Sequence, residues 1–344
     1  MMPCAILKVA VPMLACVAFA SFAVEAQGPA SEPPELKLSV AVSSALPLGA
    51  TATRFAELAN EAAARAFTVK VFPGATLAKR EPLSELQALA EGAADFAVGS
   101  TLAWSAQVPS LAVYSLPWIA PTPEQLAAIV GDPALRSAMT AKLAEFGVIA
   151  LAFAPLGHRD LATAKGPVIS PGDVRGLRVR VLALPFLSEL YVALGAAPRT
   201  LGFAEAQAAF AAGELDAQEA SAPSLESARV VAIGQKDVIR WGGTGEALVI
   251  AVRRAVWEGW SEATREQIRS AAMRAAGESD ASARDERALV ALRRQGATVV
   301  RFKAPQFAEF REAAKSVIER WSTAVGADLA ATARAAADAA APAK

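Results

Sequence analysis

Two arginines in the segment GLRVRV (residues 176–181) have the type and spacing best suited to binding a small anion. In an extended strand, Arg178 and Arg180 point to one face, and the apolar residues around them point to the other. The planar guanidinium group of an arginine can donate two parallel hydrogen bonds to one carboxylate. By themselves these residues leave two interpretations open, a solvent-exposed strand face and a carboxylate-binding site.

Residues that could support catalysis or metal binding are few. The chain has one histidine, His158, so zinc motifs that need two histidines are excluded. We interpret His158 as a structural or hinge residue rather than a general base. The sequence has no GxSxG, GxxxxGK[ST] or GxGxxG motif, and the glycine-rich WGGTGE (241–246) is predicted to be a loop between two lobes. We expect no catalytic residue, no bound metal and no cofactor.

The N-terminal segment (residues 1–26) has the pattern of a cleaved export signal. Lys8 precedes an apolar run that is short for a membrane span, and the small residues of VEA predict cleavage at the end of the segment, before a leader at 27–35. Both cysteines, Cys4 and Cys16, lie in this segment, so the exported chain would have no thiol and no disulfide. An uncleaved membrane anchor and a lipoprotein modified at Cys16 are the alternatives. The expected location is the periplasm.

The charge balance points away from a nucleic-acid partner. The chain carries 34 Lys and Arg residues against 34 Asp and Glu residues, and no run of basic residues suits an anionic surface. Hydrophobic residues make up 54% of the sequence, which indicates well-packed cores rather than disorder. The expected partner is a small molecule or another protein.

One phrase occurs twice along the chain, as ALAEGAADFAVGS (88–100) and AFAAGELDAQEAS (209–221). In each copy a helical run stops at glycine, and an aspartate then begins a strand that ends in serine. The repetition predicts two similar lobes whose strands end at the same edge, at Ser100 and Ser221. Because ligands of open parallel sheets bind outside the carboxyl ends of the strands, the two edges predict a cleft. Ser100 and Ser44, which follows the first expected strand, are ligand-binding candidates there.

Alternating short strands and helices predict an α/β protein in which helices flank mainly parallel sheets. A long helix is expected to cross between the lobes, and the C-terminal end is expected to be a low-complexity tail that frays. The expected boundaries are 36–157 with 246–280 for lobe 1, 158–245 with 281–326 for lobe 2, crossings near 155–157 and 243–247, the long helix at 261–294 and the tail at 327–344.

The order of motifs resembles the solute-binding proteins of TRAP (tripartite ATP-independent periplasmic) transporters, the DctP-like family. The segments that carry this resemblance are FPGATLAKREPLSELQALAEGAADFAVGS, VYSLPWIAPTPEQLAAIVG, PGDVRGLRVRV, GFAEAQAAFAAGELDAQEAS and LRRQGATVV. They follow the family order and cover nearly all of residues 36–325. The resemblance implies a two-lobe periplasmic binding protein fold (type II-like).

The resemblance also implies roles for particular residues. Arg180 matches the arginine that holds the ligand carboxylate, Arg159 falls where many members have a second ligand-facing arginine, and Phe203 matches an aromatic that packs on the ligand. Two positions depart from the family pattern, Gln207 in place of a tyrosine and Ala220 in place of an asparagine. The alanine predicts a monocarboxylate with an apolar body rather than a small, highly polar diacid.

The function implied is a monomeric, non-enzymatic binding protein. It would capture a small organic acid between its lobes and deliver it to the TRAP membrane permease subunits. Two alternatives stay open at this point, a periplasmic sensory subunit that docks a receptor and a periplasmic enzyme on the same two-lobe scaffold. The enzyme would need an acid-base pair, for which the sequence offers only scattered carboxylates.

Overall fold

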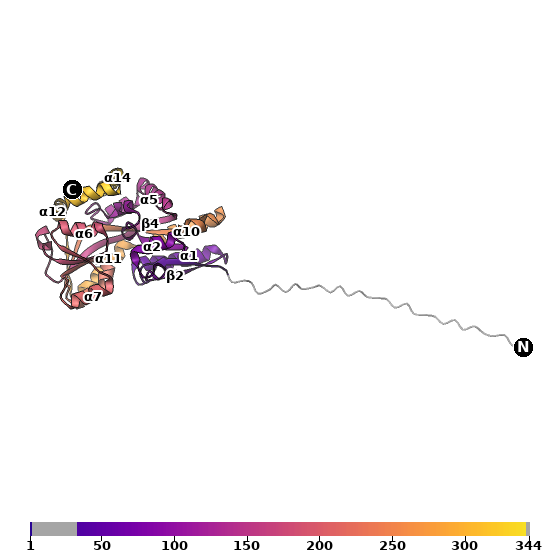
Figure 1. The fold of residues 1–344 in the computed structure, drawn as a ribbon, viewed down its shortest axis with the longest axis horizontal. Coiled ribbons are helices and arrows are strands. Elements are labelled where there is room, and N and C mark those ends of the chain that lie inside the picture. Colours follow the sequence, from indigo (N-terminus) through magenta and orange to yellow (C-terminus); the bar gives the residue numbers. More distant parts are fainter. Residues whose placement is uncertain (2–32, 342–344) are drawn as a thin grey trace. The chain divides into compact units, whose positions relative to one another are not determined.

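The structure of the protein is a computed structural model, and it describes Met1 and residues 33–341. The chain divides into two units, with the boundary between Glu32 and Pro33. The second unit holds every helix and strand given below (Figure 1). The expected export signal, with both cysteines, lies outside the described residues.

The second unit is built around nine paired strands. Their order is β2-β1-β3-β8-β4-β7-β5-β6, and β9 pairs with β8. Pairings among β1, β2 and β3, among β5, β6 and β7, and between β8 and β9 are parallel. The strands are β1 (Glu35–Val40), β2 (Thr68–Phe72), β3 (Phe96–Ser100), β4 (Val148–Thr163), β5 (Arg178–Val181), β6 (Ala197–Thr200), β7 (Ala217–Ser221), β8 (Asp237–Arg253) and β9 (Thr298–Arg301).

Strands β4 and β8 connect the two ends of this sheet. They have 16 and 17 residues and pair antiparallel, with Val148 opposite Arg253 at one end and Thr163 opposite Asp237 at the other. Strand β3 joins the first end and β7 joins the second. We call the end with β1, β2 and β3 lobe 1 and the end with β5, β6, β7 and β9 lobe 2. The pairing is irregular between them, with a register shift at Pro155–Gly157.

The segment WGGTGE was predicted to be a loop, and this is wrong, because it lies within β8. Its glycines are needed for close packing rather than for a turn. A Cβ atom at Gly242, whose φ is +59°, would lie 2.3 Å from the carbonyl oxygen of Pro121. A Cβ atom at Gly245 would lie 2.8 Å from a methyl group of Leu126. Glycine inside a strand often marks such close approach.

Helices cover both faces of the sheet. In Figure 1 the labels α1, α2, α5 and α10 lie toward the lobe 1 end, and α6, α7, α11 and α12 lie toward the lobe 2 end. The helices of lobe 1 are α1 (Pro47–Ala63), α2 (Glu85–Ala90), α3 (Thr101–Trp104), α4 (Pro123–Gly131), α5 (Pro133–Glu145), α9 (Arg254–Glu258) and α10 (Glu262–Gly277). The other helices are α6 (Pro185–Ala193), α7 (Phe203–Ala211), α8 (Ala222–Ser227), α11 (Ala281–Arg294), α12 (Ala304–Ala313), α13 (Lys315–Val325) and α14 (Ala327–Ala339).

Strand β8 shows why the core holds together. In the run ALVIAV (247–252), Leu248, Ile250 and Val252 pack into one core cluster, while the residues between them pack into another. Both faces of the strand are therefore buried, as the continuous apolar run predicts. Lobe 2 has clusters on the two faces of its sheet, and one of them also includes Leu102 of α3 and Trp118. The predicted class, an α/β fold with helices flanking mainly parallel sheets, is confirmed.

The single long helix expected at 261–294 is instead two helices, α10 and α11. They are separated at residues 278–280, and the carboxylate of Asp280 accepts a hydrogen bond of 2.9 Å from the Ala283 amide, which caps α11. Helix α10 packs against α1 in lobe 1, whereas α11 packs against α8 and β9 in lobe 2. The two halves thus pack in different lobes, as the expected boundary between residues 280 and 281 implies, but the break in the helix itself was not predicted.

The prediction of a fraying C-terminal tail is also wrong for residues 327–339, which form α14. Ala330, Ala333 and Ala337 are buried on one side of the helix and pack into the lobe 1 core. The Gln125 side chain of α4 donates a hydrogen bond of 3.2 Å to the carbonyl of Ala337. Alanine has the highest helix propensity, and its small side chain lets the two backbones approach closely.

Candidate functional site

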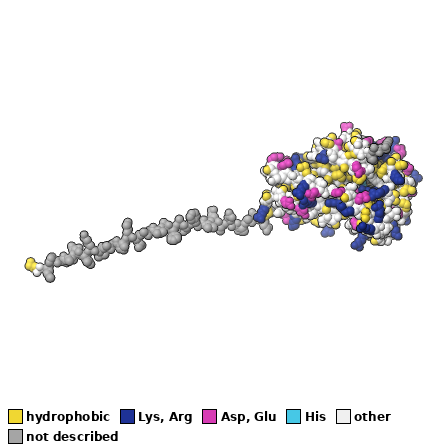
Figure 2. Space-filling view, turned by 180° about the vertical axis from the view of Figure 1, so that it is seen from behind, with side chains coloured by type: hydrophobic (Ala, Val, Ile, Leu, Met, Phe, Trp, Pro, Cys, Tyr) yellow, Lys and Arg dark blue, Asp and Glu magenta, His cyan; other side chains and the backbone are white. Residues whose placement is uncertain are grey.

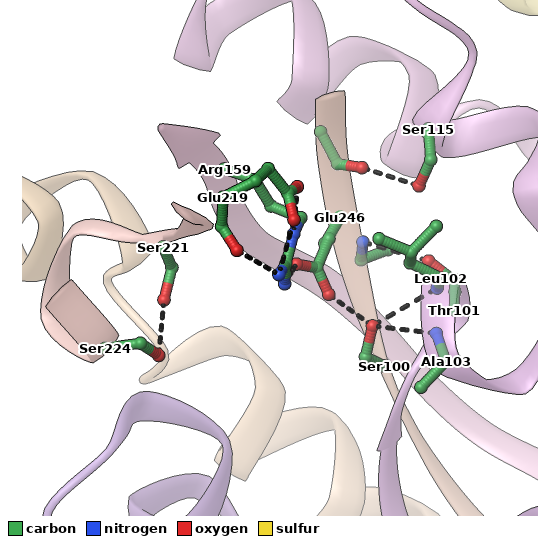
Figure 3. A network of polar contacts seen from close by, with 12 residues as sticks. Ser100, Thr101, Leu102, Ala103, Ser115, Arg159, Glu219, Ser221, Ser224 and Glu246 are labelled. Atoms are coloured by element: carbon green, nitrogen blue, oxygen red, sulfur yellow. Dashed lines mark hydrogen bonds and ion pairs between the residues drawn. The ribbon is translucent and has the colours of Figure 1, made fainter. Parts of the chain in front are cut away.

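The carboxyl ends of β3 and β7, where the repeated phrase stops, meet at a chain of polar side chains at the centre of the molecule (Figure 3). Ser100, at the end of β3, donates a short hydrogen bond to Glu246 of β8. The other oxygen of Glu246 accepts a hydrogen bond of 2.6 Å from Arg159 of β4. Arg159 lies directly opposite Ser221, the last residue of β7. The structure therefore brings both strand ends to one interlobe site.

Arg159 is held by two buried carboxylates. Its Nε donates a short hydrogen bond to Glu219, its Nη2 donates one of 2.9 Å to the same carboxylate, and its Nη1 contacts Glu246. All three residues are at least 90% buried. Burial lowers the pKa of Arg159, but the charges of Glu219 and Glu246 outweigh it and hold the pKa above its usual range. Arg159 is a fixed cation whose charge is already balanced.

Arg180 of β5 is a buried arginine of a different kind. It is 7% exposed, and its Nε donates a hydrogen bond of 3.0 Å to the carbonyl of Leu201. It forms no ion pair with any residue that the structure describes. Burial, and next the charge of Arg159, lowers the pKa of Arg180 below its usual value. A buried guanidinium without a carboxylate is costly, so its η nitrogens are suited to an anionic ligand.

A groove of about 380 Å³ opens between the lobes, lined by other residues than those of the polar cluster. On the lobe 1 side it is lined by the loop before α1 and the first turn of that helix, next to Ser44. On the lobe 2 side it is lined by Pro223 and Glu226 of α8 and by Arg284 and Arg287 of α11. Arg284 donates a hydrogen bond of 3.0 Å to the carbonyl of Pro47, which joins the two lobes.

The remaining predicted ligand-binding residues have different surroundings. Phe203, the first residue of α7, is 48% exposed. It lies two residues after Leu201, whose backbone carbonyl accepts the hydrogen bond from Arg180. Ser44 is exposed in the loop after β1. Ala220 packs with Ala222 into a core cluster of lobe 2, on the face of β7 opposite to that of Glu219, because strand side chains alternate. Phe203 is close to Arg180 along the chain of contacts, and Ala220 lies two residues after Gln218, the β7 partner of Arg180, on the same face of the sheet.

Sequence reasoning did not identify Glu219 and Glu246 as part of the site. Glu246 could have been identified from its position in the sequence, because it is a single acidic residue between a glycine-rich stretch and a fully apolar run. A buried charge in such a run needs a partner of opposite sign. For Arg284 and Arg287, which lie on an ordinary charged helix face, the sequence offers no such signal.

A second buried ion cluster lies at the register shifts of β4. Arg240 of β8 contacts Asp160 at 3.1 Å and Asp285 of α11 at 2.8 Å. Burial raises the pKa of Asp160 to about 7, partly offset by the charge of Arg240. His158 lies 2.8 Å from the carbonyl of Ala120, and burial lowers its pKa to about 4. A neutral, buried His158 agrees with its interpretation as a structural residue.

The residues that the structure describes offer neither a metal-binding cluster nor a membrane-spanning helix. Among those residues there is no group of three or more His, Cys, Asp or Glu side chains that could hold a metal ion. Within the same ranges, no helix is both long enough and apolar enough to cross a bilayer. On the face shown in Figure 2, basic and acidic side chains are interspersed, in keeping with the balanced composition.

Comparison with known proteins places these features in a family. The family model for "Bacterial extracellular solute-binding protein, family 7" (DctP) matches residues 38–324. The C4-dicarboxylate-binding periplasmic protein DctP of Rhodobacter capsulatus is 27% identical over 311 residues, which cover 89% of this chain and 92% of the relative. Two other relatives match over shorter regions. An uncharacterized protein of Sinorhizobium fredii, y4mM, is 30% identical and a solute-binding protein of Chromohalobacter salexigens is 31% identical, with matches that span 34% and 55% of their lengths and about half of this chain.

The solved structures agree with the family model. The TRAP periplasmic solute binding protein of Ralstonia eutropha H16, in complex with (S)-2-acetolactate, is 31% identical and superposes with a TM-score of 0.84 over 89% of this chain and 99% of that one. A sugar acid binding protein of Advenella mimigardefordensis, at 18% identity and a TM-score of 0.81, has the same two-lobe fold. This chain therefore belongs to family 7 of the bacterial extracellular solute-binding proteins, the DctP family of TRAP transport systems.

Proposed function

We propose that this protein is the periplasmic solute-binding component of a TRAP transporter and that it captures a small organic acid through the guanidinium of Arg180. The acid is held in the interlobe site beside Arg159, Phe203 and Ser100, and the loaded monomer delivers it to the membrane permease subunits. The protein binds its ligand and does not transform it. Its relatives from Chromohalobacter, Rhodobacter and Ralstonia are named as solute-binding or dicarboxylate-binding proteins. This supports a role in solute binding over that of a receptor-docking subunit or an enzyme.

The observation that carries the proposal is the contrast between Arg180 and the other buried arginines of the sheet. Arg159 contacts two carboxylates and Arg240 contacts two more. Arg180 is equally buried, yet its only side-chain hydrogen bond to a described residue goes to a carbonyl. A ligand carboxylate would supply the missing negative charge and accept two parallel hydrogen bonds.

The relatives support an organic acid as the ligand class. The Ralstonia protein, which shares 31% of its residues with this chain, binds (S)-2-hydroxy-2-methyl-3-oxobutanoate. The Rhodobacter protein is named for C4-dicarboxylates. Both ligand types present at least one carboxylate to the protein, and this shared group is the one that Arg180 is suited to bind.

The test is calorimetry with Arg180→Ala after a thermal-shift screen of organic acids, including (S)-2-acetolactate. Removing one partner of a desolvated charge pair costs about 2 to 5 kcal/mol, so affinity should fall by about 30-fold or more. Arg180→Lys should restore only part of it, since an ammonium cannot donate two parallel hydrogen bonds from a planar group.

Arg178→Ala is the matched control for this experiment. Arg178 lies on the same strand and pairs with Asp216 at 2.8 Å, but its side chain is 37% exposed. This variant should keep the wild-type affinity. An affinity for the best acid that survives Arg180→Ala within about threefold, less than 1 kcal/mol, would contradict the proposed role of Arg180.

A further inference from the structure

We propose that Glu219 and Glu246 restrict this site to ligands with a single carboxylate, and that Glu246 is the residue that excludes short dicarboxylic acids. The inference rests on the proposed function, in which Arg180 binds the first carboxylate. It concerns the second arginine of the site, Arg159, which would otherwise be available for a second carboxylate.

The geometry leaves no edge of the Arg159 guanidinium free. Glu219 occupies the edge formed by Nε and Nη2, and its backbone carbonyl also accepts a hydrogen bond of 3.2 Å from Nη2. Glu246 occupies Nη1 at 2.6 Å. Bidentate binding of a carboxylate requires two adjacent N–H groups that point the same way. A ligand carboxylate could reach such a pair on Arg159 only by displacing Glu219 or Glu246.

The charges of the site lead to the same conclusion. Two buried glutamates face the single guanidinium of Arg159, so this cluster has a net charge of −1 when all three groups are ionised and does not attract a further carboxylate. A monocarboxylate adds one negative charge, and Arg180 faces it directly. The second carboxylate of a short diacid would be desolvated without a cation of its own, which is unfavourable.

The other nearby arginines do not supply that cation. Arg240 is occupied by Asp160 and Asp285. Arg284 and Arg287 line the groove, but the first is only half-buried and donates to the Pro47 carbonyl, and the second is exposed. Solvent screens their charges.

Glu246 differs from Glu219 in how it is held. Each of its oxygens has one partner, Ser100 from lobe 1 and Arg159 from β4. Replacing it with glutamine removes one negative charge from the cluster, although the amide oxygen can still accept the hydrogen bond from Nη1, and Glu219 keeps the rest of the guanidinium in place. Both kinds of ligand occur among the relatives. The Ralstonia protein binds a monocarboxylate, and the Rhodobacter protein is named for dicarboxylates.

Two pairs of acids that differ only in the second carboxylate test the inference by calorimetry on the full-length protein. They are butanoate with succinate and 2-hydroxybutanoate with malate. The wild type should bind the monoacid of each pair at least tenfold more tightly than the diacid. Glu246→Gln should reduce that ratio at least tenfold, mainly through tighter diacid binding. Glu85→Gln, which changes a buried glutamate of lobe 1 that contacts Ser39, is the control and should leave the ratio within threefold.

The outcomes separate the two proposals. A wild type that binds succinate or malate more tightly than the matching monoacid overturns the selectivity and leaves the function standing. An unchanged ratio in folded Glu246→Gln overturns the role of Glu246. A wild type that binds neither acid of either pair, nor (S)-2-acetolactate, overturns both. If Glu246→Gln does not fold, Glu219→Gln and the wild-type ratio still decide the question.

Discussion

Arg159 of β4 and Glu246 of β8 form a buried ion pair, with 2.6 Å between Nη1 and Oε1, on the two strands that run through both lobes. The pair lies beside the register shifts of β4, and Glu246 also holds Ser100 of lobe 1. A change in the angle between the lobes should therefore move the residues of the proposed ligand site.

Ligand binding should close the lobes. Because each lobe has its own core and β4 is irregular where it passes between them, the lobes can move as rigid units. Small-angle scattering should show a smaller radius of gyration at saturation with the natural acid. Arg180→Ala at the same acid concentration should keep the ligand-free value. An unchanged radius in the saturated wild type would instead indicate a rigid site.

Removing Arg159 should destabilise the fold strongly. Arg159→Met leaves Glu219 and Glu246 buried without their cation, which costs about 3 to 5 kcal/mol of unfolding free energy. Arg301→Met removes an exposed ion pair with Glu286 and should cost less than about 1 kcal/mol. Urea denaturation of the two variants at pH 7 measures the difference. Equal costs would show that the buried cluster contributes no more than a surface pair.

Glu85 should make stability fall as the pH rises. Burial raises the pKa of this carboxyl group to about 8, although the Ser39 hydroxyl donates a hydrogen bond of 3.0 Å to it and opposes the shift. Between the unfolded pKa of about 4.3 and pH 8, the folded state keeps a proton that the unfolded state has released. The contribution of Glu85 to the free energy of unfolding is therefore largest at low pH, and it decreases as the pH rises from about 4.3 to about 8.

The variant Glu85→Gln tests the predicted direction of this pH dependence. It should be more stable than the wild type at pH 8.5, by an amount on the order of 3 kcal/mol, and should differ little from it near pH 4.5. Denaturant unfolding at the two pH values gives the comparison. A stability difference that does not change with pH would mean that Glu85 is ionised in the folded protein.

Helix α14 should be sensitive at its buried face. Ala333 is fully buried against the lobe 1 core, so Ala333→Leu inserts three carbon atoms into a packed interface and should cost about 1 to 3 kcal/mol. Ala335 is exposed on the same helix, and Ala335→Leu should change stability by less than about 0.5 kcal/mol. Equal effects in thermal unfolding would contradict the packing of α14.

The sequence determines the local elements and the family. The repeated phrase predicts strands that end at Ser100 and Ser221, as β3 and β7 do, and its glycines follow closely after the ends of α2 and α7. These signals are local, because side-chain periodicity depends only on the conformation of the segment itself. The motif order is also a property of the sequence, and it led to the family that the comparisons show.

Only the tertiary structure decides which charges meet. The sequence presents Arg159 and Arg180 as similar candidates, yet strand pairing brings Glu219 and Glu246 onto the first and leaves the second without a carboxylate among the described residues. Glu246 lies 87 positions from Arg159 along the chain. No local pattern encodes such a contact, because it depends on the register of β4 with β8, while the surroundings of Arg180 depend on the pairing of β5 with β6 and β7.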